Sequence, residues 1–362
     1  MVTFSSSASN LITGDTNGVP DIFIHDRATG ITQRVSVDSS GGQASNWSLT
    51  PSISADGNDV TFKNLGGLVP GDTNGYWDIF VHDRTTGITE RVSVDSAGAQ
   101  ANDHSDGSVL SADGRHVAFS SRASNLVSND GNGFGDVFVR DRSTGTTERV
   151  SVDSSGNEGN KESGGIGNPA VSISEDGRLV AFVSAATNLV ANDLNGTYDS
   201  FTHDRFSGVT ERVSVDSMGI EGNRTSGGFP SISASGQLVA FPSIASNLVP
   251  NDTNGVWDIF VRDRCDALWS NYGAGFPGTL GVPPLTSRGD PVLGSTITID
   301  LGNSYGSSTF AVLLVGNLQT DVSTRKGRPP ARPARAHARP RARLEWCVHR
   351  WRPSRRLRAV RP

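Results

Sequence analysis

The sequence predicts an all-β fold: a β-propeller of about five four-stranded antiparallel blades, followed by a small β module and a disordered basic tail. Three observations lead to this prediction. The segment GDTNGVPDIFIHDRATGITQRVSV, at 14–37, recurs along the chain. Each copy carries short apolar runs separated by turn residues, which is typical of strands. The composition, with 42 Gly in 362 residues and 19% charged residues, suits turn-rich β structure rather than helices.

The repeats align on the motif D-x-N-G. Its first Asp recurs at steps of 57, 58, 63 and 59 residues, and a near-constant period of this kind indicates a stacked or radial array. The repeats are predicted to start near residues 1, 50, 107, 169 and 229, and the propeller to span 1–270. The pattern leaves open whether the full ring has five, six or more blades.

Each repeat is predicted to form four strands, which in the second copy are 51–54, 59–63, 78–83 and 89–94. The link between the first two carries Asp-Gly, a strong hairpin signal, and the link between the last two reads DRTTG. Both links are short, so the blade is an antiparallel meander. A linear β-solenoid is the alternative, but it usually has a shorter period and parallel pairing.

The other two links are long, and alternating strand direction places both at the same end of each blade. One end of the molecule is therefore expected to be rich in loops and the other to consist of tight turns. Functional residues concentrate on loops that a rigid scaffold holds. Phenylalanines recur in the second and third strands and are expected to fill the space between blades: Phe4, Phe62, Phe119, Phe182 and Phe241, with Phe23, Phe80, Phe138, Phe201 and Phe260.

The stretch SADGRHVAFSS at 111–121, followed by DVFVRD and then ERVSV, resembles the WD-like propeller repeat of TolB-type proteins of secreted bacterial type. The match covers residues 1–265, five times over. The resemblance implies a β-propeller whose general role is binding rather than catalysis. The chain departs from that group in its longer blades and in a longer loop that carries D-x-N-G-x-x-D.

The predicted ring is incomplete at both ends. The first repeat begins with its second strand, at 2–6, and the fifth loses its RVSV strand. Ring closure needs every edge paired or covered. Either a later segment supplies the missing strand or the gene begins upstream, and we expect the second. A secretion signal would have been lost with that upstream part, so the expected location is extracellular or periplasmic.

After the repeats the sequence changes character. Residues 271–316 carry Pro and Gly turns around two alternating segments, STITIDL and STFAVLLVG, which resemble the small C-terminal β module of some secreted bacterial proteins. Residues 317–362 form an Arg/Pro/Ala-rich tail without periodicity. This tail is either a disordered nucleic-acid-binding arm or a frame-shifted translation, and we expect the latter.

Charge and composition exclude several classes. The tail from Arg325 holds 14 of the 32 basic residues and one of the 37 acidic ones, which leaves a net charge of −18 on residues 1–324. An acidic body repels nucleic acid, so only the tail could bind it. The cysteines, Cys265 and Cys347, give no disulfide framework. The longest apolar run, 310–316, is too short to span a bilayer.

The motif D-x-N-G-x-x-D is the best candidate for chemistry. Calcium takes six to eight oxygens from carboxylates, amides and carbonyls, and a Gly-containing turn can direct such oxygens to one point. The motif lacks a terminal bidentate Glu, so any site would be weak. The alternative is a plain turn whose side chains bond their own backbone. The candidate metal ligands are Asp15, Asn17, Asp21, Asp72, Asn74, Asp78, Asp130, Asn132, Asp136, Asp193, Asn195, Asp199, Asp252, Asn254 and Asp258.

Two further repeat positions are predicted to be structural. An Asp-Arg pair ends each third strand, and a second Arg recurs at Arg34, Arg91, Arg149 and Arg212; both are expected to form exposed ion pairs at the tight-turn end. One position holds His25, His82 or His203 in three repeats and Arg140 or Arg262 in two. A position that accepts either residue is expected to be a solvated basic site and not a metal ligand.

The sequence contains no HExxH, CxxC, P-loop or GxSxG motif. The expected function is therefore a non-catalytic scaffold that binds a protein or carbohydrate partner through its loop-rich end, with calcium as the one cofactor considered. The alternative is a propeller-fold polysaccharide hydrolase or lyase, since carboxylates are abundant. A deep channel mouth lined by nonequivalent acidic residues or His would favour the enzyme, and near-identical loops would favour binding.

Overall fold

The computed structural model describes residues 1–165, 170–264, 285–288 and 298–301. The chain divides into two compact units, Met1–Arg264 and Cys265–Pro362. Every element in the described residues is a strand, which confirms the predicted all-β class. Those residues include no helix of the length and apolar character needed to cross a bilayer.

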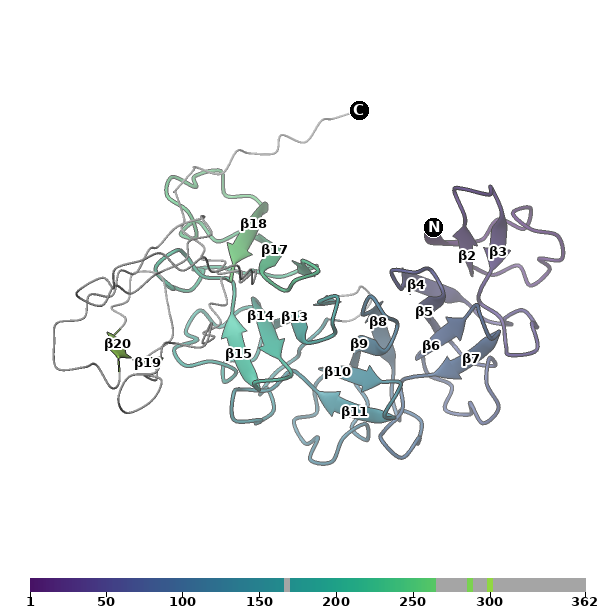
Figure 1. Cartoon of the computed structure of the whole chain (residues 1–362), viewed down its shortest axis with the longest axis horizontal. Coiled ribbons are helices and arrows are strands. Elements are labelled where there is room, and N and C mark those ends of the chain that lie inside the picture. The colour runs from purple at the N-terminus through teal and green to yellow at the C-terminus, as the bar shows by residue number, and fades with distance from the viewer. Residues whose placement is uncertain (166–169, 265–284, 289–297, 302–362) are drawn as a thin grey trace, which may run out of the picture. The chain divides into compact units, whose positions relative to one another are not determined.

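The first unit contains five antiparallel sheets, which are blades of the propeller type (Figure 1). Blade 1 has the strand order β1-β2-β3, blades 2, 3 and 4 each have four strands in chain order, and blade 5 has β16-β17-β18. The strands of blades 1 and 2 are β1 (Val2–Ser6), β2 (Asp21–His25), β3 (Thr32–Arg34), β4 (Ser48–Ile53), β5 (Asp59–Asn64), β6 (Asp78–Asp83) and β7 (Ile88–Arg91).

Blades 3, 4 and 5 repeat this plan. Their strands are β8 (Ser105–Leu110), β9 (His116–Ser121), β10 (Asp136–Asp141), β11 (Thr146–Arg149), β12 (Val171–Ile173), β13 (Leu179–Ser184), β14 (Asp199–Asp204), β15 (Val209–Arg212), β16 (Ser231–Ile232), β17 (Leu238–Ser243) and β18 (Asp258–Asp263). In the second unit β19 (Leu285–Arg288) pairs with β20 (Thr298–Leu301). The predicted STITIDL strand overlaps β20, whereas STFAVLLVG and the tail 317–362 lie outside the described residues.

The fourth strand is shorter than predicted. In blade 2 it was expected at 89–94, but β7 ends at Arg91. The reason is local: the hydroxyl of Ser93 accepts the backbone N–H of Ile79 at 3.1 Å, so a side chain replaces the ladder carbonyl there. Beyond that point the chain turns, and Val94 makes an isolated bridge to Gln100.

The hydrophobic core consists of the interfaces between consecutive blades. Each blade presents one face built on Phe from its second and third strands. The opposite face is built on Ile or Val in blades 1, 2, 3 and 5, and on Ser200 and Thr202 in blade 4. Between blades 2 and 3, Phe119 and Phe138 stack with ring centroids 5.9 Å apart and pack against Ile79 and Val81 of the preceding blade. All four side chains are buried, so the inter-blade role predicted for the phenylalanines is confirmed at this interface.

The tight-turn ends of neighbouring blades are also bonded. The amide N–H of Ala55 donates to the carbonyl of Ala112, and the N–H of Ala112 donates to Glu175, at 2.9 and 3.0 Å. Arg142 of blade 3 pairs with Asp59 and Glu90 of blade 2 at 2.8 and 2.6 Å. The predicted Asp-Arg turn pairs therefore act between blades as well as within them.

Truncation of a core phenylalanine tests this packing. We expect Phe119→Ala to lower the free energy of unfolding by about 3 to 5 kcal/mol, because it removes a fully buried ring from the interface between blades 2 and 3. Urea denaturation followed by circular dichroism measures the change. Phe206→Ala is the control, since Phe206 is 88% exposed and its loss should change stability little. Equal effects of the two substitutions would contradict the predicted core.

Candidate binding face built on the acidic loops

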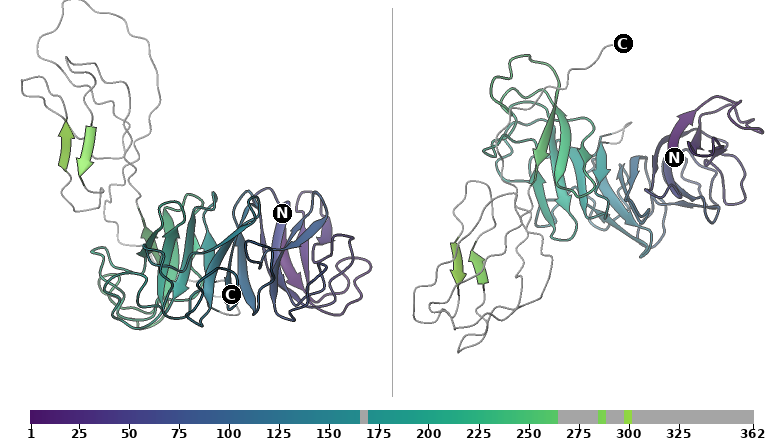
Figure 2. Two further views of the ribbon diagram at one scale, coloured as in Figure 1. Left: turned by 90° about the horizontal axis from the view of Figure 1, so that it is seen from below. Right: turned by 45° about the horizontal axis from the view of Figure 1, so that its top comes forward.

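The five D-x-N-G-x-x-D segments, here called the acidic loops, occupy 15–21, 72–78, 130–136, 193–199 and 252–258. Each leads directly into a strand: β2, β6, β10, β14 or β18. In a complete four-stranded blade this is the third strand, and below it keeps that name in blade 1 as well. The strands run between the two ends of the first unit (Figure 2), and the antiparallel order places these loops at the same end as the links between blades. The loop-rich end predicted from the sequence is therefore present in blades 1 to 5.

Two left-handed residues shape each acidic loop. The residue before the first Asp has a positive φ, and it is Gly14 or Gly71 in blades 1 and 2 and Asn in blades 3 to 5. The Gly of the motif is left-handed too, with φ of 71° at Gly133. Gly and Asn are the residues that tolerate this conformation, which explains why the sequence repeats them here.

The Asn of the motif ties the loop together. In blade 3 the Nδ2 of Asn132 donates to Asp136 Oδ2 at 2.9 Å and to the carbonyl of Gly159 at 3.0 Å. Its Oδ1 accepts the N–H of Phe134 at 2.7 Å. The same bonds to the last Asp and to the amide two residues on recur in all five loops. The amide oxygen of each Asn is therefore already used by the backbone.

An arginine lies between the two carboxylates of the loop. In blade 3 the Nη1 of Arg149 is 3.4 Å from Asp130 Oδ1, 3.2 Å from Asp136 Oδ2 and 2.9 Å from Glu158 Oε2. Arg34, Arg91 and Arg212 bridge the corresponding pairs in blades 1, 2 and 4. These arginines were expected at the tight-turn end, which is wrong: Arg34, Arg91, Arg149 and Arg212 end β3, β7, β11 and β15 at the loop-rich end, and each supplies the cation of its acidic loop.

A serine completes the anchor. The hydroxyl of Ser151 donates to Asp136 Oδ1 at 2.5 Å and accepts the N–H of Val137 at 3.0 Å. Ser36, Ser93 and Ser214 do the same in blades 1, 2 and 4. Sequence reasoning missed this serine and the role of the arginine. The available signal was their constant spacing from the last Asp, 15 residues for Ser and 13 for Arg.

The four arginine-bridged loops differ in one charge. Arg34 and Arg91 also bond Gln43 and Gln100, at 2.8 and 3.1 Å, whereas blades 3 and 4 have Glu158 and Glu221 at the same place. Burial, together with the nearby Asp136 and Glu158, raises the pKa of Asp130 to about 6 against the pull of Arg149. Burial and Asp199 likewise raise the pKa of Asp193 to about 6.

These contacts decide how well calcium fits. In blades 1 and 2 each loop offers two carboxylates that share an arginine, which is a poor set for a divalent cation. In blades 3 and 4 three carboxylates have ligand atoms within 4.8 Å of one another: Asp130, Asp136 and Glu158 in one, and Asp193, Asp199 and Glu221 in the other. The fit is therefore better in blades 3 and 4. The fifth loop keeps both bonds of its Asn, from Asn254 to Asp258 and from the Val256 N–H to Asn254, but no arginine bridges its carboxylates in the part of the chain that the structure describes.

The two residues between the Gly and the last Asp vary from blade to blade. They are Val19 and Pro20 in blade 1 and include aromatic side chains in the others: Tyr76, Trp77, Phe134, Tyr198 and Trp257. Phe134, Tyr198 and Trp257 are 44%, 38% and 53% exposed. Trp47, on the link between blades 1 and 2, is 54% exposed. The loop-rich end thus carries solvent-facing aromatic residues on a bonded backbone.

Blades 2 and 3 add an asymmetric cluster at this end. The ammonium of Lys63 pairs with Asp106 Oδ1 at 2.8 Å and lies 5.1 Å from the centroid of Trp77. The rings of Tyr76 and His104 pack edge to face with their centroids 4.9 Å apart. His104 Nδ1 accepts the backbone N–H of Trp77 at 3.0 Å. The other blades lack this set of residues in sequence.

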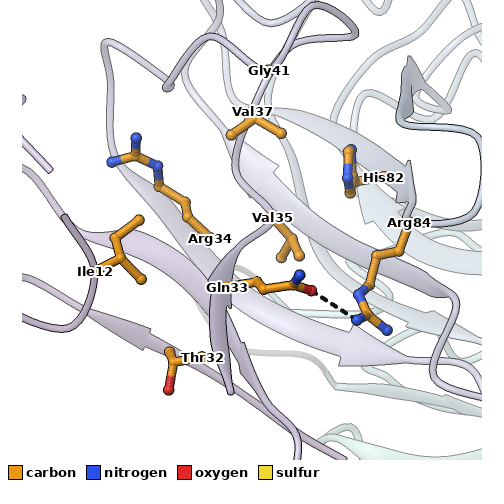
Figure 3. A pocket seen from close by; sticks show the side chains of 9 residues that line it. All are labelled: Ile12, Thr32, Gln33, Arg34, Val35, Val37, Gly41, His82 and Arg84. Carbon is orange, nitrogen blue, oxygen red and sulfur yellow. Dashed lines mark hydrogen bonds between the residues drawn. The ribbon is translucent and has the colours of Figure 1, made fainter. Parts of the chain in front are cut away.

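One surface depression is defined by blades 1 and 2 (Figure 3). Its lining includes Thr32, Gln33 and Val35 from blade 1 with His82 and Arg84 from blade 2, and its volume is about 430 Å³. Gln33 Oε1 accepts a bond from Arg84 Nη2 at 2.9 Å across it. Its lining contains no carboxylate.

The histidine position differs from expectation. His82 and His203 are both 7% exposed, and the Nδ1 of each lies within hydrogen-bond distance of a threonine on the next strand, Thr89 and Thr210. Burial lowers the pKa of both imidazoles. The predicted solvated basic site is therefore wrong for these two residues, because the neighbouring blade surface and the threonine enclose the ring.

The chain is similar to solved β-propeller structures, at low identity. It aligns with TolB from Acinetobacter baumannii over 80% of this chain and 51% of that one, at 15% identity and a TM-score of 0.39. It aligns with a TolB-like protein from Agrobacterium tumefaciens over 78% and 83%, at 16% identity and a TM-score of 0.38. The chain thus spans about half the length of the Acinetobacter protein.

A third similar structure is the β-propeller domain of the Trilobed protease from Pyrococcus furiosus, which has an open velcro topology. The alignment covers 60% of this chain and 55% of that one, at 12% identity and a TM-score of 0.35. No protein-family model and no curated protein matches the sequence.

The extra carboxylates of blades 3 and 4 predict a pH effect. The pKa values of Asp130 and Asp193 are raised in the folded chain, so the protonated carboxyls favour folding at low pH. This contribution to the free energy of unfolding is lost as the pH rises from the ordinary pKa of Asp through about 6. Burial, the main cause of the raised pKa values, is unchanged in the double variant Glu158→Gln, Glu221→Gln, which removes only the repulsion from the added carboxylates. We expect this variant to melt about 1 to 2 °C above the parent at about pH 7.5 and to lose this advantage by about pH 5.

Differential scanning calorimetry across this range measures the effect. The glutamines keep the bond to arginine, as Gln43 and Gln100 do in blades 1 and 2. The matched control is Glu175→Gln, an exposed residue at the tight-turn end outside the acidic loops. A gain in melting temperature that does not depend on pH would count against the assigned cause.

Proposed function

We propose that this protein is a non-catalytic β-propeller scaffold that binds a protein or carbohydrate partner through its loop-rich end. The proposal rests on one observation: within each acidic loop some residues fix the backbone and others vary from blade to blade. The Asn, Asp, Ser and Arg contacts recur and fix the backbone. The two residues beside them vary and include an aromatic side chain in blades 2 to 5, which is exposed in blades 3 to 5. Aromatic side chains on a rigid scaffold are the common anchors of binding surfaces.

The cluster of blades 2 and 3 supports the same proposal. The ammonium of Lys63 lies over the ring of Trp77, and His104 holds the backbone N–H of that residue, which reduces the entropy lost on binding. Aromatic rings held in this way suit a sugar face or an apolar protein side chain. Because the aromatic positions differ between blades, the face is not symmetric, and a partner would bind in one orientation.

A polysaccharide hydrolase or lyase remains the alternative. It needs a pair of carboxylates at a pocket, free to act as acid and base or nucleophile. The carboxylates of the acidic loops are instead engaged by Arg, Ser and Asn, and the depression of blades 1 and 2 is lined without a carboxylate. These features favour binding over hydrolysis. We place the protein outside the cytoplasm, in the periplasm or beyond the cell, in keeping with that ligand class.

Substitution of the exposed rings tests the binding face. We expect the triple variant Trp47→Ala, Phe134→Ala, Tyr198→Ala to lower binding at least tenfold in a glycan array or in a pull-down from a cell-envelope fraction, because it removes anchors from three sites on the loop-rich end. The control is Ile31→Ala with Ile88→Ala, exposed residues at the tight-turn end. Equal binding by both variants would place the partner elsewhere.

Calcium is a separate prediction. We expect about 1 mM calcium to raise the melting temperature of the parent chain, through the clusters of blades 3 and 4, and to leave the variant Glu158→Gln, Glu221→Gln unchanged. The substitutions give blades 3 and 4 the residue that blades 1 and 2 already have, so the variant is its own structural control. A parent melting temperature that does not respond to calcium would remove the prediction.

A further inference from the structure

An arginine joins the tight-turn ends of consecutive blades. It follows the third strand of its blade and pairs with a carboxylate on the fourth strand of the blade before. Arg142 of blade 3 pairs with Glu90 of blade 2 at 2.6 Å, and Arg205 of blade 4 pairs with Glu148 of blade 3. Each of these two arginines also donates to the carbonyl of the turn glycine that precedes the second strand of its own blade.

The residue that begins the second strand lies at this contact, and it changes from blade to blade. In blade 2 it is Asp59, which pairs with Arg142 at 2.8 Å. In blade 3 it is His116, and in blade 4 it is Leu179. All three occupy the same place, since each packs closely against the turn glycine of the next blade. His116 therefore puts an ionisable base where the preceding interface has an anion.

The imidazole of His116 is almost enclosed. The residue is 9% exposed, and its Nδ1 is buried with no hydrogen-bond partner among the described residues. A Cβ at Gly177 would lie 2.3 Å from that nitrogen, so the turn of blade 4 closes over the ring. His82 and His203 differ, because a threonine hydroxyl lies within hydrogen-bond distance of each Nδ1. A proton added at Nδ1 of His116 would meet no such acceptor.

Charges of both signs surround this imidazole. Arg205 faces it from blade 4, and Arg115 adds a positive charge within blade 3. Asp141 Oδ2 lies 3.8 Å from Nε2, but this carboxylate already accepts two bonds from Arg115, at 2.9 and 2.6 Å. Asp113 is the other nearby acid of blade 3, and it accepts bonds from the Ser111 hydroxyl and the Arg115 N–H.

These surroundings disfavour the charged form of His116. Asp176, in the turn of blade 4, accepts its bonds from Ser174 and Arg178 within that turn. Burial, and after it Arg205, lowers the pKa of His116 from its ordinary value of 6.5 against the opposite effect of Asp141. The neutral imidazole therefore favours folding above about pH 6.5, and this contribution is lost as the pH falls below that value.

We propose that His116 makes the interface between blades 3 and 4 sensitive to acid. Protonation places a further cation beside Arg205 in an enclosed site, and the tight-turn ends of the two blades separate. At the interface of blades 2 and 3 the same place holds Asp59, and a carboxylate can take up a proton without adding a positive charge. Acid therefore opens the blades at one defined interface. The proposal does not depend on the function proposed for the loop-rich end.

Hydrogen exchange in the purified full chain tests the proposal. The N–H of Ala112 donates to Glu175 across the interface of blades 3 and 4, and the N–H of Ala55 donates to Ala112 across that of blades 2 and 3. We expect the protection factor of the Ala112 amide to fall at least about fivefold from about pH 7.5 to about pH 5.5, while that of Ala55 changes less than about twofold. Mass spectrometry with residue-level fragmentation measures both amides in one sample.

Two variants introduce residues that other blades have at this place. His116→Asp gives blade 3 the residue of blade 2, and His116→Leu gives it that of blade 4. Both should hold the protection factor of Ala112 equal at the two pH values. The control is His82→Arg, since blade 3 has Arg140 at that position, and it should respond to acid as the parent does. Circular dichroism at both pH values confirms that every variant is folded.

The comparison of the two amides in the parent chain needs no variant, so it decides the matter even where a substitution prevents folding. Equal protection of Ala112 at the two pH values in the parent would overturn the proposal. So would an equal loss of protection at Ala55, or an acid response that persists in both His116 variants.

Discussion

The structure depends on burial of sheet faces against one another. Each blade has a Phe-rich face and an opposite face, built mostly on Ile or Val, and neither can be buried within the blade itself. Phe119 and Phe138 are fully buried only because Ile79 and Val81 belong to the blade before them. The fold therefore gains stability one interface at a time, as repeat proteins do, and any terminal blade leaves apolar surface in water.

That scaffold allows the acidic loops to be both charged and rigid. Asp136 is fully buried, which would be costly for an unpaired carboxylate. It accepts bonds from Ser151, Asn132 and Arg149, so the first residue of the third strand is held from three directions. Where blades 1 and 2 have Gln, blades 3 and 4 have Glu, which adds one negative charge at the same place. Burial is the main cause of the raised pKa of Asp130, and Asp136 and then Glu158 add to it.

The repeat period, the hairpin turns and the Phe core could be predicted because each depends on residues close in sequence or on a strict repeat. Asp56-Gly57 specifies its turn locally, and a Phe stands at the position of Phe62 in every blade. The arginine bridge was not predicted because it links residues on two strands, such as Arg149 and Asp130, whose meeting depends on the sheet. Burial of His82 likewise depends on Thr89, seven residues away on the next strand.

The acidic loops also show how repetition can coexist with specificity. Because the four arginine-bridged loops share one set of backbone contacts, those contacts cannot distinguish one blade from another. Only the side chains beside them can do so, and these range from Val19 and Pro20 to Tyr76 and Trp77. A change at the exposed ones, Phe134, Tyr198 and Trp257, costs the scaffold little, since no core contact is lost. Selection for a new partner could therefore act on these few residues while the blades, and the interfaces that stabilise them, remain the same.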